Sequence, residues 1–425
     1  MLPIADAFEY EYRGCDLIYG RGCVERLGEY LAEHDLRSAL LVCGSNVGAN
    51  DDLMGPIREG LGDRLAGVFD GTTPDKQAES AFEVVEAMDE TDANVLVGVG
   101  GGSSLDVARQ ASVLAADGRS LADLREEARE NGGVISQPDS DGQPDPDDDP
   151  SDPNDGQPPV IVVPTTFAGA DVSSGGSVEV LSAEKSPTDQ PVSVRGSAMP
   201  VADFADPALF ETTPHGVLAG SAMNGFDKGI ETPYARDANP VSDATAVHGL
   251  RLLSDGLPKI MDENDSTDSE KATDAENAAG AMDRAVVGAL LVQLDRKVSI
   301  VHAFGHGFAR RYAVQQGAVH AVVVPHVLRY LFSEVDASRD LLATGLGVNP
   351  TDRSDDEVAE AVVEAVTELR DALDAPTRLR DLPETQEEDL PAVAEFVVDD
   401  HPMERAPKGL EPTAEEIEAV LREAW

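Results

Sequence analysis

The chain is poor in lysine, in cysteine and in aromatic residues, and it has no long apolar run. Only seven of its 425 residues are lysine, and Lys and Arg together number 32 against 81 Asp and Glu, a formal net charge of −49. Such a field repels nucleic acid phosphates and anionic lipid headgroups, so neither is an expected partner. In about 1 M salt the Debye length falls to about 3 Å, which screens the repulsion among surface carboxylates. With 41% hydrophobic residues, the composition predicts a soluble, halophilic protein.

The cysteines and the apolar segments favour a cytoplasmic protein. Cys15, Cys23 and Cys43 are odd in number and lack metal-type spacing, so we expect small core residues in a reducing compartment. No apolar segment approaches the roughly 20 residues needed to cross a bilayer. The N-terminus lacks the basic region and apolar core of a secretory signal.

The length predicts two domains. In the first half, short buried strands alternate with helices, which predicts a Rossmann-like parallel sheet that is covered on both faces and binds ligands at the carboxyl ends of its strands. From Pro207 onward the pattern is helical. We therefore predict an α/β nucleotide domain over 1–205 and an all-helical domain over 206–425. The expected helices of the second half are 215–231, 241–255, 277–311, 317–333, 357–374, 388–398 and 413–424.

Two acidic tracts interrupt this pattern, at 131–159 and 262–276. Each is too polar to bury apolar surface, so we predict mobile surface loops and assign them no function.

A glycine-rich turn follows the predicted strand at 94–99. Gly100, Gly101 and Gly102 precede Ser103 and Asp106, at the start of a predicted helix. Glycines let backbone N–H groups approach an anion, and the helix N-terminus adds its dipole. The spacing differs from GxGxxG, so we expect a different cradle for a pyrophosphate. A tight strand-to-helix corner without a ligand is the alternative. Thr165 and Thr166 follow the strand at 160–163 and place hydroxyl groups at the same edge of the sheet.

Two pairs of polar residues lie at helical i, i+4 spacing in the second half. They are Asn224 with Lys228, and His302 with His306. This spacing projects both side chains of a pair from one helix face. An amide, an ammonium and two imidazoles make a poor metal site, because divalent cations need carboxylate, imidazole or thiolate ligands.

Four ordered blocks resemble the iron-containing alcohol dehydrogenase superfamily. They are GGGSSLDVAR (100–109), PTTFAGADVS (164–173), VADFADPALFETTP (201–214) and HAFGHGF (302–308). The resemblance implies a domain that binds NAD or NADP and a helical domain that in most members holds a catalytic divalent metal. It also implies that Asp106 bonds the nicotinamide amide or ribose and that Thr165 and Thr166 line the cofactor groove. At Ser45, after the strand at 38–43, no acidic residue is present to select the 2′-hydroxyl, so NADP is tolerated.

At the four positions that match the family's metal ligands, this chain has Asn224, Lys228, His302 and Gln316. One ligand of four is kept, so we do not expect bound Fe or Zn. The region MNGFDKGIETPYARDANP is similar to that of maleylacetate reductases, which have Asn at the first position and work without metal. They also have a further His where this chain has His320.

These observations predict a metal-independent NAD(P)-dependent oxidoreductase that transfers hydride between nicotinamide and a small carbonyl, alcohol or activated alkene. Lys228, in place of the cation, could stabilise the developing negative charge on oxygen. His302, His306 or His320 could relay the proton, and Arg236 could bind a substrate carboxylate. The alternatives are a metal-dependent alcohol dehydrogenase with altered ligands and a catalytically silent nucleotide-binding protein. A homodimer is a family-level expectation.

Overall fold

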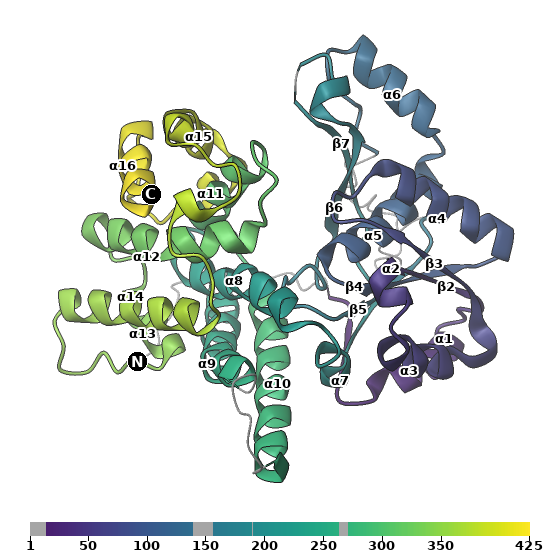
Figure 1. The fold of residues 1–425 in the computed structure, drawn as a ribbon, viewed down its shortest axis with the longest axis horizontal. Coiled ribbons are helices and arrows are strands. Elements are labelled where there is room, and N and C mark those ends of the chain that lie inside the picture. The colour runs from purple at the N-terminus through teal and green to yellow at the C-terminus, as the bar shows by residue number, and fades with distance from the viewer. Residues whose placement is uncertain (1–13, 139–155, 189, 263–270) are drawn as a thin grey trace. The chain divides into compact units, whose positions relative to one another are not determined.

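The computed structural model describes residues 14–138, 156–188, 190–262 and 271–425 (Figure 1). Most of both acidic tracts lies outside these residues. Contacts divide the chain into two units, which we describe separately. The sheet unit comprises Tyr12–Thr166 and Ala170–Thr212. The helical unit contains Thr213–Trp425 together with the short segment Phe167–Gly169.

The sheet unit is built on six parallel strands in the order β1-β8-β5-β4-β2-β3. The predicted parallel sheet is therefore confirmed. The strands are β1 (Asp16–Tyr19), β2 (Ala39–Gly44), β3 (Leu65–Thr72), β4 (Val95–Gly100), β5 (Val160–Pro164) and β8 (Ala202–Ala205).

Helices cover both faces of this sheet because its central strands are apolar on both sides. All residues of β4 and β5 are buried. One core contains Leu40, Leu96 and Val162 with residues of α4 (Ala78–Thr91), α5 (Gly102–Asp117) and α6 (Leu121–Glu130). The other contains Leu41, Val97 and Ile161 with residues of α1 (Leu27–Glu33) and α3 (Asp51–Leu61).

A separate hairpin completes the sheet unit. Its strands β6 (Gly175–Leu181) and β7 (Val192–Ser197) are antiparallel and do not join the main sheet. Val178 and Val194 still contribute to the core that α5 covers.

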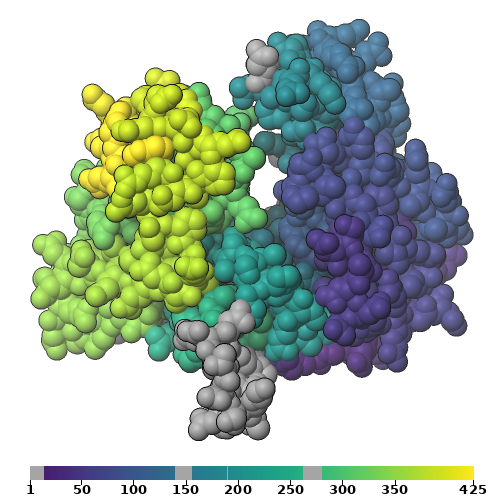
Figure 2. Space-filling view, viewed as in Figure 1, coloured from purple at the N-terminus to yellow at the C-terminus, as the bar shows by residue number. Residues whose placement is uncertain are grey.

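The helical unit contains nine longer helices among the described residues. They are α8 (His215–Glu231), α9 (Pro240–Asp262), α10 (Lys271–Gln293), α11 (Ile300–Ala309), α12 (Gln316–Glu334), α13 (Arg339–Leu346), α14 (Asp355–Ala372), α15 (Leu390–Asp399) and α16 (Ala414–Ala424). On the face seen in Figure 2 the C-terminal segments, in yellow-green and yellow, form a continuous surface. No described helix is both long enough and apolar enough to cross a membrane.

The single helix predicted over 277–311 is wrong. The chain leaves helical geometry between α10 and α11, where Asp295 adopts a left-handed φ of 52°. Asp295 there accepts hydrogen bonds from Asn239 and Lys297. Local side-chain bonding thus competes with the helix in a charged stretch. After the break, α11 begins beside the buried side chain of Glu231, which accepts hydrogen bonds from the N–H groups of Val301 and His302.

Candidate functional site

The glycine-rich turn lies between β4 and α5, as the sequence predicts. Gly100 has a φ of +126°, which favours glycine, and its carbonyl accepts a hydrogen bond from the Thr165 backbone N–H at 3.0 Å. A Cβ on Gly101 would lie 3.3 Å from Cγ2 of Thr166. The turn is therefore held against the end of β5, and a side chain at Gly101 would crowd Thr166. Gly101 and Gly102 are partly exposed, as a phosphate cradle needs.

The position of this turn in the sheet also favours a nucleotide. The chain passes from β2 outward to β3 and then returns to β4 on the other side of β2. Parallel sheets bind ligands at such a reversal, beyond the carboxyl ends of the strands. Ser45 lies there, exposed, at the start of α2 (Ser45–Gly48), and a Cβ on Gly100 would lie 3.5 Å from Val47. The predicted cofactor residues of the sheet unit thus gather at one edge.

Asp106, one turn into α5, is held between two cations. Its Oδ1 accepts a hydrogen bond from Nη1 of Arg109 at 2.8 Å, and its Oδ2 lies 2.6 Å from Nζ of Lys76. Arg109 is fully buried and also donates to the backbone carbonyls of Ala170 and Asp171. Both carboxylate oxygens are therefore positioned by the protein itself.

In the helical unit, Lys228 is a buried residue of α8. Its Nζ donates to the carbonyl oxygens of Ala168 at 2.6 Å and of Gly169 at 2.8 Å. Its exposed fraction is 6%. The ammonium is thus fixed by two backbone dipoles and does not lie on the surface.

One stripe of α8 holds the whole Phe167–Gly169 segment. Ser221, Gly225 and Lys228 follow at i, i+4 and i+7, which places them on one helix face. Ser221 Oγ accepts from the Phe167 N–H at 3.1 Å, and a Cβ on Gly225 would lie 2.1 Å from the Phe167 carbonyl oxygen. The helix and the segment are therefore in backbone contact.

Two buried carboxylates of α8 pair with the two buried histidines. Glu231 Oε2 contacts Nδ1 of His302, and its Oε1 accepts from the backbone N–H groups of Val301 at 2.6 Å and His302 at 3.2 Å. Asp227 Oδ2 lies 3.0 Å from Nδ1 of His320, but these two atoms do not form a hydrogen bond. The rings of His302 and His320 meet at an angle of 60° with centroids 4.7 Å apart. These four side chains form a cluster that we call the α8–α11–α12 cluster.

Burial controls the protonation of this cluster. It lowers the pKa of His320 to about 3, and with His320 and Lys228 it lowers the pKa of His302 well below its ordinary value. It raises the pKa of Glu231 to about 7 and, with Glu231, raises the pKa of Asp227. Both imidazoles are therefore neutral at pH 7.

The other predicted site residues of the helical unit have different surroundings. His306 is partly exposed, and its Nδ1 lies 2.7 Å from Asp400 Oδ2. Gln316 is the first residue of α12, and a Cβ on its neighbour Gly317 would lie 3.5 Å from the Asn224 backbone N. Asn224 Oδ1 is buried without a hydrogen-bond partner.

Arg236 is exposed, and its Nε donates to the Ala406 carbonyl at 3.0 Å. This contact gives Arg236 a structural use, and its proposed role toward a substrate carboxylate stays a prediction.

The residues at the four family ligand positions do not fit a divalent metal. An ammonium bonded to two carbonyls stands at position 228, and neutral amides stand at 224 and 316. Among the residues that the structure describes, no group of three His, Cys, Asp or Glu side chains is arranged to hold an ion. A cation at this position would face the Lys228 charge, and the remaining three positions offer it one imidazole and two neutral amides, none of them a carboxylate.

Sequence reasoning missed the partners that orient these side chains. Asp227 and Glu231 are spaced i, i+4 on the same helix as Asn224 and Lys228, so charged residues in an otherwise apolar helix were the available signal. Arg109 was visible within the glycine-rich block, whereas nothing in the sequence connects Lys76 to Asp106, thirty positions away.

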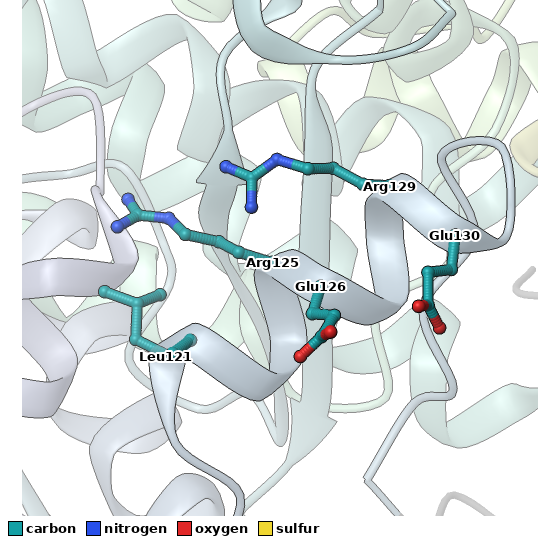
Figure 3. A pocket seen from close by; sticks show the side chains of 6 residues that line it. Leu121, Arg125, Glu126, Arg129 and Glu130 are labelled. Atoms are coloured by element: carbon teal, nitrogen blue, oxygen red, sulfur yellow. The ribbon is translucent and has the colours of Figure 1, made fainter.

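A surface pocket of the sheet unit has no part in this chemistry. It lies over α6 and is lined by Leu121, Ala122, Arg125, Glu126, Arg129 and Glu130. Figure 3 shows the arginines on one side of the helix and the glutamates on another. Arg125 is already bonded to Glu79 and to the Val180 carbonyl. The pocket contains none of the predicted site residues.

Comparison with known proteins agrees with this architecture. The iron-containing alcohol dehydrogenase model matches residues 15–194, and the C-terminal model of the same family matches residues 218–425. The chain belongs to the iron-containing alcohol dehydrogenase family. It is thus a dehydrogenase or reductase of that family.

Individual relatives of the family are distant. A 1,3-propanediol dehydrogenase of Klebsiella pneumoniae is 26% identical over 96% of both chains. Maleylacetate reductase 1 of Cupriavidus pinatubonensis is 24% identical over 76% of this chain and 75% of its own. The crystal structure of a 1,3-propanediol oxidoreductase covers 98% of this chain and 100% of its own, with a TM-score of 0.76 at 22% identity. Maleylacetate reductases are thus one of several branches of the family that are similar to this chain.

Proposed function

We propose that this member of the family is an NAD(P)-dependent oxidoreductase that interconverts a small carbonyl compound and its alcohol without a divalent metal. The observation that carries the proposal is the buried Lys228 ammonium, fixed at a position where metal-dependent relatives keep a ligand. The relatives named for activity on 1,3-propanediol and maleylacetate support this substrate class.

The residues of the sheet unit fit a dinucleotide. Gly100, Gly101, Gly102 and Ser103 would hold its diphosphate, and Asp106, Thr165 and Thr166 would hold its nicotinamide half. When bound, this cofactor supplies or accepts the hydride. The absence of a carboxylate at Ser45 leaves room for a 2′-phosphate, so both NAD and NADP are accepted.

The helical unit supplies the electrostatics. Negative charge develops on the substrate oxygen when hydride reaches the carbonyl carbon, and a preorganised cation in a water-excluded site stabilises that charge. Lys228 is this cation, because its two carbonyl partners fix its position before the reaction begins. Neutral His302, oriented by Glu231, offers its Nε2 to the proton that leaves or reaches the oxygen.

Metal analysis combined with one variant pair tests this proposal. We expect purified protein to contain far less than one Fe or Zn per chain and to keep its turnover after dialysis against a chelator. Lys228→Met should lower kcat by about 10²-fold, the usual cost of losing one transition-state charge partner. Lys297→Met is the matched control, because Lys297 is also largely buried and paired, with Asp295.

One tightly held divalent ion per chain, lost together with activity on chelation, would identify the metal-dependent alternative. Cofactor binding without turnover of any aldehyde, oxo-acid or alcohol would identify the silent nucleotide-binding alternative. Equal turnover in Lys228→Met and Lys297→Met would remove the catalytic role of Lys228.

A further inference from the structure

The ion pair between Lys76 and Asp106 has unequal partners on its two sides. Arg109 is 0% exposed and is bonded to Asp106 Oδ1 and to two backbone carbonyls, so it cannot move without disrupting the core. The Lys76 side chain is 35% exposed and contacts Asp106 Oδ2 at 2.6 Å. One carboxylate thus lies between a fully buried cation and a partly exposed one, and the three charges sum to +1.

The backbone of Lys76 is in a costly conformation. Its φ is +50°, in the left-handed region, where a residue with a Cβ is strained. Glycine would avoid this strain, so the lysine side chain itself is expected to have a use at this position. Its ion pair is partly buried, because Asp106 is 8% exposed. The lysine is also one of only seven in a chain of net charge −49.

The loop that carries Lys76 packs on the first turn of α5. Thr72 Oγ1 lies 2.7 Å from Ser104 Oγ, and Ser103 Oγ donates to the Pro74 carbonyl at 3.4 Å. These contacts place Lys76 beside the residues that directly follow the glycine-rich turn. The ammonium is therefore adjacent to the cradle that the proposed function assigns to the diphosphate.

Two other carboxylates lie near Lys76 and are bonded elsewhere. Asp75 Oδ2 and Glu179 Oε1 both accept from Nε2 of Gln77, each at 3.1 Å. Asp106 is thus the carboxylate that Lys76 contacts at bonding distance.

We propose that Lys76 binds the diphosphate of the dinucleotide. Its ammonium leaves Asp106 and bonds phosphate oxygens instead, while Arg109 keeps Asp106 in position for the nicotinamide half. This inference rests on the proposed function. Lysine binds phosphate as a point charge on a flexible stem, and the diphosphate carries more negative charge than one carboxylate. When the Lys76 ammonium moves to the phosphates, Oδ2 of Asp106 becomes available to the ligand and the phosphates gain a bound cation.

Ligand fragments test this exchange without reference to turnover. Binding of NADH, ADP-ribose and adenosine is measured by calorimetry for the wild type, Lys76→Met and Lys76→Arg, at low and high salt. We expect Lys76→Met to bind NADH and ADP-ribose about tenfold more weakly at low salt, with less loss at high salt, and adenosine unchanged. Lys76→Arg should recover most of the affinity.

The control is Lys259→Met, which removes an exposed lysine paired with Asp255 at the same distance of 2.6 Å in the helical unit. Its affinities and melting temperature should equal those of the wild type. If Lys76→Met binds ADP-ribose normally, or weakens all three ligands alike, the phosphate role of Lys76 is wrong. If the wild type binds NADH but lacks turnover, only the oxidoreductase proposal fails; if it binds none of the ligands, both proposals fail.

Discussion

Two buried cations hold four consecutive backbone carbonyls. Lys228 binds those of Ala168 and Gly169, and Arg109 binds those of Ala170 and Asp171. A buried cation is stable only when its donors are used, and these carbonyls supply acceptors that need no second side chain. Ala168 and Gly169 belong to the helical unit, and Ala170 and Asp171 belong to the sheet unit. The change from one cation to the other therefore coincides with the unit boundary between residues 169 and 170.

Asp243 offers a pH test at the scale of one residue. Half-burial raises its pKa from 3.8 to about 6, and its Oδ1 has no hydrogen-bond partner. The folded state therefore binds this proton more tightly than the unfolded state, so the stability that the protonated form provides is lost as pH rises from about 4 to about 6. Asp243→Asn should be more stable than the wild type at pH 7.5, by about 1 kcal/mol after allowance for partial exposure.

Urea midpoints between pH 4 and pH 8 measure this difference, which should vanish at the acid end. Asp63→Asn, at an exposed position, serves as the control and should show no such trend. A difference that is constant with pH would mean that the carboxyl is not desolvated.

At the scale of an element, α8 is the helix on which the site depends. Its contact with Phe167–Gly169 requires glycine at 225, whereas a Cβ on Gly216 of the same helix would meet nothing within 4 Å. Gly225→Ala should therefore destabilise the protein by about 2 kcal/mol or more, because the neighbour is backbone and cannot rotate away. Gly216→Ala should be neutral or stabilising by a few tenths of a kcal/mol.

Thermal melting of both variants, with NADH turnover as a second readout, checks this contact. Equal melting temperatures together with equal turnover would show that the segment does not lie against α8. A Gly225→Ala protein that folds normally but turns over slowly would show that the contact is needed for catalysis and not for stability.

The sequence predicted elements well where apolar periodicity is strong. β2, β4 and β5 are continuous buried runs, and the ends of α8, α12 and α16 lie within a few residues of their predicted positions. The break at Asp295 was not predictable from periodicity, since Gln293 and Ile300 are buried on either side of it. α13 was missed because its eight residues span little more than two turns.

The sequence indicates which residues are candidates for the site, but it does not indicate which side chains contact them. The glycine-rich turn and Lys228 follow from motif and spacing. The pairing of Glu231 with His302 and of Asp227 with His320 depends on how α11 and α12 pack on α8, seventy or more positions further along the chain. The residues around a position in the sequence do not show which distant helices pack against it. The two carboxylates were therefore not predicted as partners of the histidines.

At the scale of the whole molecule, the net charge of −49 predicts a salt response. Repulsion among carboxylates opposes folding, and it is screened when the Debye length falls below their spacing. The melting temperature should rise between 0.1 M and 2 M KCl, by on the order of 5 °C. Sucrose at equal osmolality is the control, because it is excluded from the surface without screening charge. A melting temperature that rises equally in both would assign the effect to exclusion and not to electrostatics.

The hydrogen bonds from Lys228 to the carbonyls of Ala168 and Gly169 also limit which substitutions position 228 can accept. A change of Lys228 to His would remove two hydrogen bonds to backbone carbonyls and would leave them without this donor in a buried place. Substitutions that act through a shared partner are not additive, so position 228 and the segment it holds are expected to change together. An imidazole introduced at 228 alone is therefore expected to lower folding stability unless the backbone of residues 167–169 changes with it.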